Sequence, residues 1–258
     1  MGGPITFSFF SSLVTSLLLL PFSLKAVPRA VLTDARFWGV CVLVCVDLVF
    51  TNVSLSLIDL SLQQCIKALL PVITVIVHAC RGNECPRLVT RVRLFGLSLG
   101  AMLLSGHTEG KLWGIMAMVV AVTASAAKNV VAYDAMKSFK CEANVVVFTF
   151  WMDLVLTVLI APFAIASGET VPMTSDQVPL FLFTAALGGV RVVSQFVFLS
   201  QTSATSAGVA NVFVQIFTVA LGVIVFAEPR TPLFGLGVSL SVVFALLHAG
   251  DTHNYNRV

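Results

Sequence analysis

Charged residues are scarce in this sequence. Asp, Glu, Lys and Arg together make up 10% of the 258 residues, whereas a soluble domain carries about 25%. Hydrophobic residues make up 58%, and the mean hydropathy is +0.99. This balance excludes an ordinary soluble domain, and a net charge of only +3 gives no basic surface for nucleic acid. The composition indicates a multi-pass membrane protein whose main partner is the lipid bilayer.

Residues that carry chemistry are equally few. The chain has four His and 12 acidic residues, and they are scattered along its length. No nucleophile–base pair, metal-ligand cluster or phosphate-binding glycine loop stands out, so we expect no enzyme, no metal and no cofactor. The six Cys residues show no metal spacing. Cys80 and Cys85 fall in a basic loop that we place in the reducing cytosol, so we expect no disulfide there.

Long apolar runs, by contrast, fill the chain. A membrane-spanning helix needs about 20 apolar residues. Nine segments meet or approach this length, and they are 5–24, 37–57, 60–79, 92–107, 112–132, 145–167, 179–200, 206–227 and 232–250. Only Ile58 and Asp59 separate the second segment from the third, so these two spans are expected to form a tight hairpin.

The basic residues predict the orientation of the chain. Cytosolic loops carry an excess of Lys and Arg. Ten basic residues fall on one side of the predicted spans, and they are Lys25, Arg29, Arg36, Arg81, Arg87, Arg91, Arg93, Lys137, Lys140 and Arg257. The other side holds only Lys111 and Arg230. The C-terminus is therefore expected to face the cytosol.

An internal repeat relates the two halves of the chain. The stretch FSFFSSLVTSLLLLPF at 7–22 is similar to FTFWMDLVLTVLIAPF at 148–163, an offset of 141 residues, and LFGL at 94–97 recurs at 233–236, an offset of 139. The matched spans are five apart, an odd number, so the two copies must point in opposite directions. This predicts the inverted repeat of many secondary transporters, with a substrate site near the membrane midplane.

The repeat also predicts the domain organisation. We expect an all-α polytopic membrane protein, in which residues 1–110 form a truncated first half-repeat and residues 111–258 the second. The fifth span has no repeat partner, because its partner would precede Met1. The parent fold is therefore expected to have ten spans, of which this chain holds nine and lacks the first.

Lys67 lies near the middle of the third span. An ammonium at that depth costs roughly 2.5–3.5 kcal/mol on insertion scales, so it normally faces a polar cavity or a partner. One alternative is a lysine that reaches the surface by snorkelling, although seven residues separate it from Leu60. The other is an anion site, because Lys is a common point-charge ligand of phosphate. Pro71 follows one turn later and is expected to loosen the helix.

Four other charged side chains lie within spans or at a span end. Asp47 and Arg191 are 144 residues apart, near-equivalent positions of the repeat, and either form an ion pair or serve the substrate. Asp47 would hold Arg191 while the site is empty. Lys128 is expected to snorkel to the cytosolic surface. Asp153 carries a coupled proton, pairs with a cation, or caps a packing network.

Four segments resemble one transporter family. TNVSLSLIDLSLQQCIKALLPV at 51–72 is similar to the stretch of triose-phosphate translocator-like transporters that reads asparagine–x–Ser–Leu, a polar stretch, Ile-Lys-Ala and a proline. SATSAGVANVFVQIFTVALGVIVFAEPRTP at 203–232 resembles their ninth helix and the following loop, AAKNVVAYDAMK at 126–137 the end of their sixth helix, and residues 2–22 their second. The family belongs to the drug/metabolite transporter superfamily, which has ten helices in two inverted halves.

The resemblance implies the exchange of a phosphate-bearing sugar across an organelle membrane. It makes Lys67 a phosphate ligand and places Asn211 just before the family's ninth-helix motif. Plastid members carry a Lys-Arg pair where this chain has Val214 and Gln215, which argues against a plain triose-phosphate carrier. A nucleotide-sugar carrier of the secretory pathway or a divergent sugar-phosphate carrier remains. Arg191 falls near a family tyrosine close to the substrate and would restore a positive group.

We therefore expect an alternating-access antiporter for a small anionic substrate, a sugar phosphate or a nucleotide sugar, in a Golgi or ER membrane in preference to the plastid envelope. Lys67, Arg191, Asn211 and Gln215 are its candidate substrate ligands. Two rivals stay open, a non-transporting membrane scaffold and an exporter of drugs or amines that would use Asp47 and Asp153. The oligomeric state is open as well, with a homodimer as one alternative.

Overall fold

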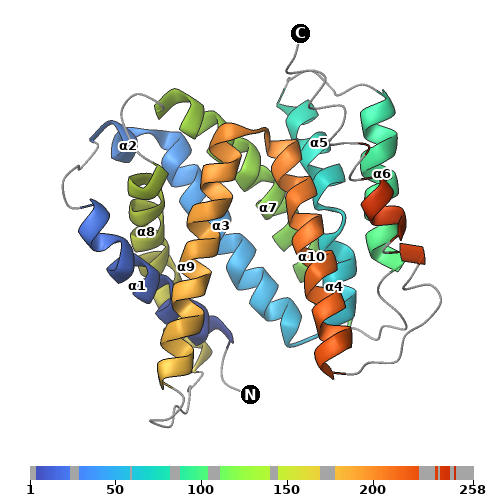
Figure 1. Cartoon of the computed structure of the whole chain (residues 1–258). Helices are drawn as coiled ribbons and strands as arrows, with labels where there is room; N and C mark the ends of the chain where they lie inside the picture. The colour runs from blue at the N-terminus through green and yellow to red at the C-terminus, as the bar shows by residue number, and fades with distance from the viewer. Residues whose placement is uncertain are drawn as a thin grey trace. The chain divides into compact units, whose positions relative to one another are not determined.

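The computed structural model describes residues 4–23, 29–58, 60–81, 88–103, 111–139, 145–168, 178–226, 236–237, 239–244 and 247. These residues are nearly all helical (Figure 1). The helices are α1 (Pro4–Ser23), α2 (Arg29–Thr33), α3 (Ala35–Leu55), α4 (Leu60–Lys67), α5 (Leu70–Cys80), α6 (Leu88–Leu103), α7 (Leu112–Phe139), α8 (Val145–Ser167), α9 (Val178–Gln201) and α10 (Ala204–Phe226). Residues 236–237 and 239–244 are helical as well.

Helices cover eight of the nine predicted spans, and α8 has the predicted bounds. Among the described residues, α3, α8, α9 and the Leu112–Lys137 part of α7 are long and apolar enough to cross a membrane. The expected boundary between the second and third spans is present, since α3 ends at Leu55 and α4 begins at Leu60, and the tight hairpin stays a prediction. The ninth predicted span and the second LFGL stretch lie largely outside the described residues. The count of nine spans and the inverted repeat therefore stay predictions.

The chain divides into two compact units, and each combines an early and a late part of the sequence. The first unit consists of Met1–Asn52 and Lys128–Ser203, and the second of Val53–Ala127 and Ala204–Val258. Helices α3 and α7 each contribute to both units. Each unit thus draws on both predicted half-repeats, 1–110 and 111–258, and that division stays a prediction.

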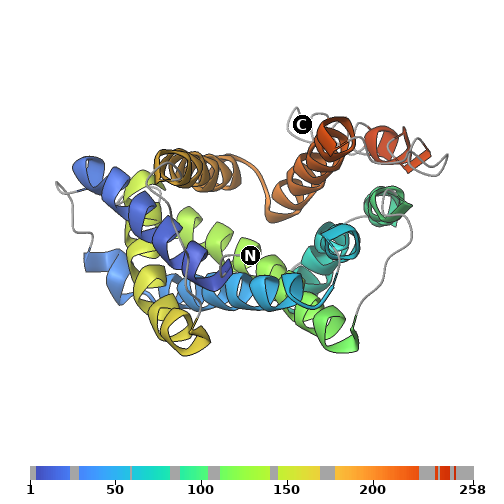
Figure 2. The ribbon, with the colours of Figure 1, turned by 90° about the horizontal axis from the view of Figure 1, so that it is seen from below.

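The first unit is built on α8. Helix α1 packs against α8 and α9, and α8 packs against α9 (Figures 1 and 2). Phe148 of α8 is 2% exposed and makes edge-to-face ring contacts with Phe37 of α3, at 5.6 Å between centroids, and Phe196 of α9, at 5.7 Å. Such aromatic pairs add stability beyond the area that they bury. The ring of Phe148 on α8 therefore packs against both α3 and α9.

The second unit is built around α5, α6 and α10. These three helices pack against one another, and α4 packs against α6. Ala68, Leu97 and Val212 belong to one of its apolar clusters. Gly96 and Gly100 of α6 lie so close to Phe244 and Ser241 that a Cβ added at either glycine would come within 2.6–2.7 Å of them. Small residues four apart let membrane helices approach closely, and this spacing holds the C-terminal helical residues against α6.

Candidate functional site

The third predicted span is broken in its middle. Helix α4 ends at Lys67, a turn follows at Ala68 and Leu69, and α5 begins at Leu70. Pro71 explains the break, because it has no N–H to donate to the carbonyl of Lys67 four residues earlier, and its ring crowds that carbonyl. The backbone forms a tighter turn here, in which Leu69 N donates to the carbonyl of Ile66, three residues earlier, at 3.1 Å. This confirms the expected effect of Pro71.

Lys67 therefore lies at an interruption of the helix. It occupies the last turn of α4 and is half-buried, while Ile66 and Ala68 on either side of it are buried in apolar clusters. Just beyond it begins α5, in whose first turn Pro71 has no N–H and Ile73 N donates to Leu69 O at 3.0 Å, so few donors remain for a ligand. A helix N-terminus carries a partial positive charge that adds to the charge of a nearby ammonium. The negative end of α4 meets the positive end of α5 at the same break, so the net positive charge there comes from Lys67.

Helix α10 passes directly over this break. A Cβ added at Gly208 would lie 3.2 Å from Pro71 Cα, so only a residue without a side chain lets the two backbones come so close. Helix α10 runs antiparallel to α5, so the residues after Gly208 extend toward the α4 side of the break (Figure 1). Asn211 and Gln215 follow three and seven residues later, on the same side of α10 as Gly208.

The two candidate amides on α10 are both partly enclosed. Asn211 and Gln215 are half-buried, and Gln215 Oε1 is a buried atom with no hydrogen-bond partner among the described residues. Val214, by contrast, is 51% exposed. Of the two positions where the resembling family has basic residues, position 215 is thus the more enclosed. A buried acceptor without a partner is costly, which favours a polar ligand or water beside Gln215.

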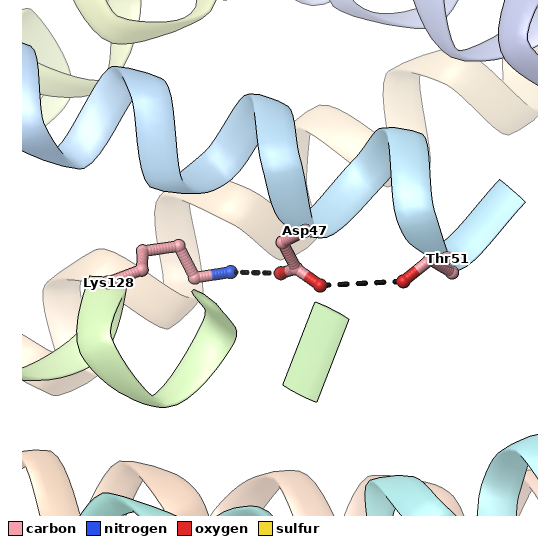
Figure 3. A network of polar contacts seen from close by, with 3 residues as sticks. All are labelled: Asp47, Thr51 and Lys128. Atoms are coloured by element: carbon pink, nitrogen blue, oxygen red, sulfur yellow. Dashed lines mark hydrogen bonds and ion pairs between the residues drawn. The ribbon is translucent and has the colours of Figure 1, made fainter. Parts of the chain in front are cut away.

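The structure shows which partner Asp47 has, and it is not Arg191. Lys128 Nζ lies 2.8 Å from Asp47 Oδ2, and Thr51 Oγ1 donates to Asp47 Oδ1 at 3.4 Å (Figure 3). The side chains of Lys128 and Asp47 are 13% and 18% exposed. Arg191, on α9 of the same unit, is exposed. The predicted pair of Asp47 with Arg191 was therefore wrong, and so was the prediction that Lys128 snorkels to the surface.

The physical reason is proximity between α3 and α7. Near-equivalent positions in a repeat do not have to touch, whereas opposite charges in apolar spans gain most by pairing. Asp47 and Lys128 were both visible in the sequence as charges within or beside spans. Their opposite sign was the signal for this pair, but which helices lie side by side cannot be read from the sequence.

Asp153 lies deep inside the first unit. It is 3% exposed, and its Oδ2 has no hydrogen-bond partner among the described residues. Thr157 one turn later donates to the backbone carbonyl of Asp153 at 2.8 Å, not to its carboxyl group. The six predicted site residues thus divide between the units, with Lys67, Asn211 and Gln215 in the second and Asp47, Asp153 and Arg191 in the first.

Comparisons with known proteins place these features in context. The model of the EamA-like transporter family matches residues 112–249. A probable sugar phosphate/phosphate translocator of Arabidopsis thaliana is 24% identical over 239 residues, which cover 88% of this chain and 77% of the relative. The chloroplastic phosphoenolpyruvate/phosphate translocator 2 of the same plant is 22% identical over 251 residues, covering 91% of this chain and 66% of the relative.

A solved crystal structure shows the same fold. It superposes with a TM-score of 0.79 at 14% sequence identity, and the match covers 95% of this chain and 88% of the other. At this identity the likeness extends to the fold alone.

Proposed function

The chain belongs to the EamA-like transporter family, and from that premise we propose that it is an antiporter for a phosphate-bearing sugar. The substrate is a sugar phosphate or a nucleotide sugar, which crosses an organelle membrane by alternating access. The relatives from Arabidopsis thaliana are named as phosphate translocators, which supports a phosphorylated substrate. We also propose a Golgi or ER membrane, because Val214 and Gln215 stand where plastid members carry a Lys-Arg pair. The bias of basic residues supports a cytosolic C-terminus.

The observation that carries this proposal is the break between α4 and α5. Discontinuous helices near the midplane form the substrate sites of many secondary transporters, and their half-helix N-termini point at anionic groups. Here the break has a lysine on one side and a helix N-terminus on the other. We propose that the substrate phosphate binds at this break, with Lys67 as its charged ligand.

Helix α10 would contribute to the same site. Gly208 brings α10 onto the break, and Asn211 and Gln215 extend from it along one face. Amide groups bind sugar hydroxyls and phosphate oxygens without adding charge. We therefore propose that Gln215 hydrogen-bonds the substrate where a plastid-type carrier would have a cation. Arg191 is exposed in the first unit, and its role as a second positive group stays a prediction, for which Arg191→Lys should impair exchange because the fork is lost although the charge is kept.

The ion pair of Asp47 weighs against an exporter of amines. A cation binder needs a carboxylate whose charge is available, but Lys128 already neutralises Asp47 at 2.8 Å. The remaining candidate for that role, Asp153, is 3% exposed. Neither carboxyl group therefore offers an organic cation an accessible negative charge.

The test is exchange transport by the full chain in proteoliposomes. Vesicles are preloaded with inorganic phosphate, a sugar phosphate or a nucleoside monophosphate, and uptake of labelled sugar phosphates and nucleotide sugars is measured. We expect uptake only when an exchangeable anion is inside. Lys67→Gln should reduce uptake at least tenfold, whereas Lys137→Gln, which removes an exposed lysine in the last turn of α7, should not.

Three results would contradict the proposal. Normal uptake by Lys67→Gln would remove Lys67 from the site. A correctly folded wild-type chain that moves none of these anions would favour the scaffold alternative, and competition by organic cations instead of anions would favour the exporter.

A further inference from the structure

An apolar groove lies between two helices of the second unit, and one of its lining residues, Val72, belongs to the first turn of α5 beside the break. It has a volume of about 350 Å³ and lies between α5 and α6, lined by Val72, Val75, Ile76, Arg91, Val92, Leu94 and Phe95. Its floor is buried, because Val75 and Leu94 are 8% and 1% exposed and belong to the apolar cluster shared with α10. Its rim is open, since Ile76, Val92 and Phe95 are 55–60% exposed.

Arg91 is the one charged residue among the residues that line this groove. It lies in the first turn of α6 and is exposed. Helix α5 ends at Cys80 and α6 begins at Leu88, so Arg91 and the exposed Arg81 stand at the same, connected end of the two helices. Arg93 is near in sequence, but its Nη1 already donates a hydrogen bond to Leu247 O at 2.8 Å. The groove therefore has an apolar length and a cationic end.

This pattern matches one class of membrane molecule. Apolar packing alone does not select a ligand in a bilayer, because lipid tails are as apolar as leucine. Selection must come from the arginine, and basic pockets between membrane helices bind anionic lipid head groups. A helix of a second copy would fill the groove equally well but would leave the guanidinium without a counter-charge.

We propose that the groove between α5 and α6 binds an anionic phospholipid. One acyl chain lies along Val92 and Phe95, and the phosphate is held by Arg91, whose planar fork can grip it bidentately. The proposed phosphate ligand, Arg91, lies where α5 ends and α6 begins, at the opposite end of α5 from Lys67, and the proposal does not depend on which substrate the protein carries.

Native mass spectrometry of the full chain in detergent tests this. The protein is mixed with equal amounts of phosphatidylglycerol and phosphatidylcholine that have the same acyl chains. One basic residue near the membrane surface favours an anionic lipid about fivefold, so phosphatidylglycerol adducts should exceed phosphatidylcholine adducts by about this factor. Arg91→Gln should bring the ratio to about one, and Arg91→Lys should give an intermediate ratio, because the charge is kept while the planar fork is lost.

Matched variants separate this site from general lipid binding. Lys111→Gln removes another exposed cation of the same unit and should leave the ratio unchanged. Val92→Trp fills the groove and should reduce both adducts, whereas Val89→Trp, an equally exposed position outside the lining, should not. Glycerol 3-phosphate, a head group without a chain, should not displace the lipid.

Three outcomes would overturn the proposal. They are equal binding of the two lipids by the wild type, an unchanged ratio in Arg91→Gln, or a chain dimer that forms without lipid and is lost in Val92→Trp. Substrate exchange failing in every variant would contradict the proposed function alone, because the lipid ratio is measured without transport.

Discussion

Breaking the ion pair between Asp47 and Lys128 should be more harmful than removing it entirely. Asp47→Asn leaves an ammonium without its counter-charge inside a span, and Lys128→Gln leaves a carboxylate in the same position (Figure 3). Loss of one partner of a buried pair costs about 3–5 kcal/mol. Because the two side chains are still 13% and 18% exposed, we expect the lower end, about 3 kcal/mol for each single variant.

The double variant, Asp47→Asn with Lys128→Gln, tests whether the two side chains interact. Replacing both charges by neutral amides leaves no uncompensated charge, and such replacements are often neutral, so it should fall within about 1 kcal/mol of the wild type. The assay is thermal unfolding of the purified chain in detergent, where each single variant should lower Tm by at least about 6 °C. If the two single losses simply add in the double variant, the two groups do not interact and the reasoning fails.

Three further substitutions probe the break and the buried carboxyl group. Gly208→Ala should destabilise the fold by about 1–3 kcal/mol, because its Cβ would lie 3.2 Å from Pro71 Cα. The control, Gly188→Ala, should be tolerated, because its Cβ would lie at an ordinary 3.7 Å from Ser11 Oγ. Thermal unfolding of both variants distinguishes crowding at Gly208 from a general intolerance of change. Pro71→Ala restores an N–H that can close the helix, so it should keep or raise helix content by circular dichroism while lowering exchange transport, and unchanged transport would separate the break from function. Asp153→Asn places a neutral group of the same shape where Oδ2 has no partner, so Tm should hold or rise; a loss of transport with Tm retained would assign Asp153 the coupling role that the sequence left open.

The sequence by itself determined the class of protein and most of its helices. With 10% charged residues and long apolar runs, the chain has to satisfy its backbone hydrogen bonds inside each segment, and the helix is the way to do so in lipid. The break after Lys67 was also local, because Pro71 lacks the N–H that the helix would need. The interruption of the helix at Lys67 could thus be anticipated from a charge and a proline one turn apart.

Only the tertiary structure decided which helices became neighbours. The repeat offset predicted that Asp47 pairs with Arg191. The ion pair of Asp47 is instead with Lys128, because α3 and α7 approach each other at these two residues (Figure 3). The close approach of Gly208 to Pro71 and the burial of Gln215 Oε1 are likewise properties of packing between segments about 140 residues apart. Apolar periodicity says that a face is buried, but it does not say against what, because any apolar face satisfies it equally well.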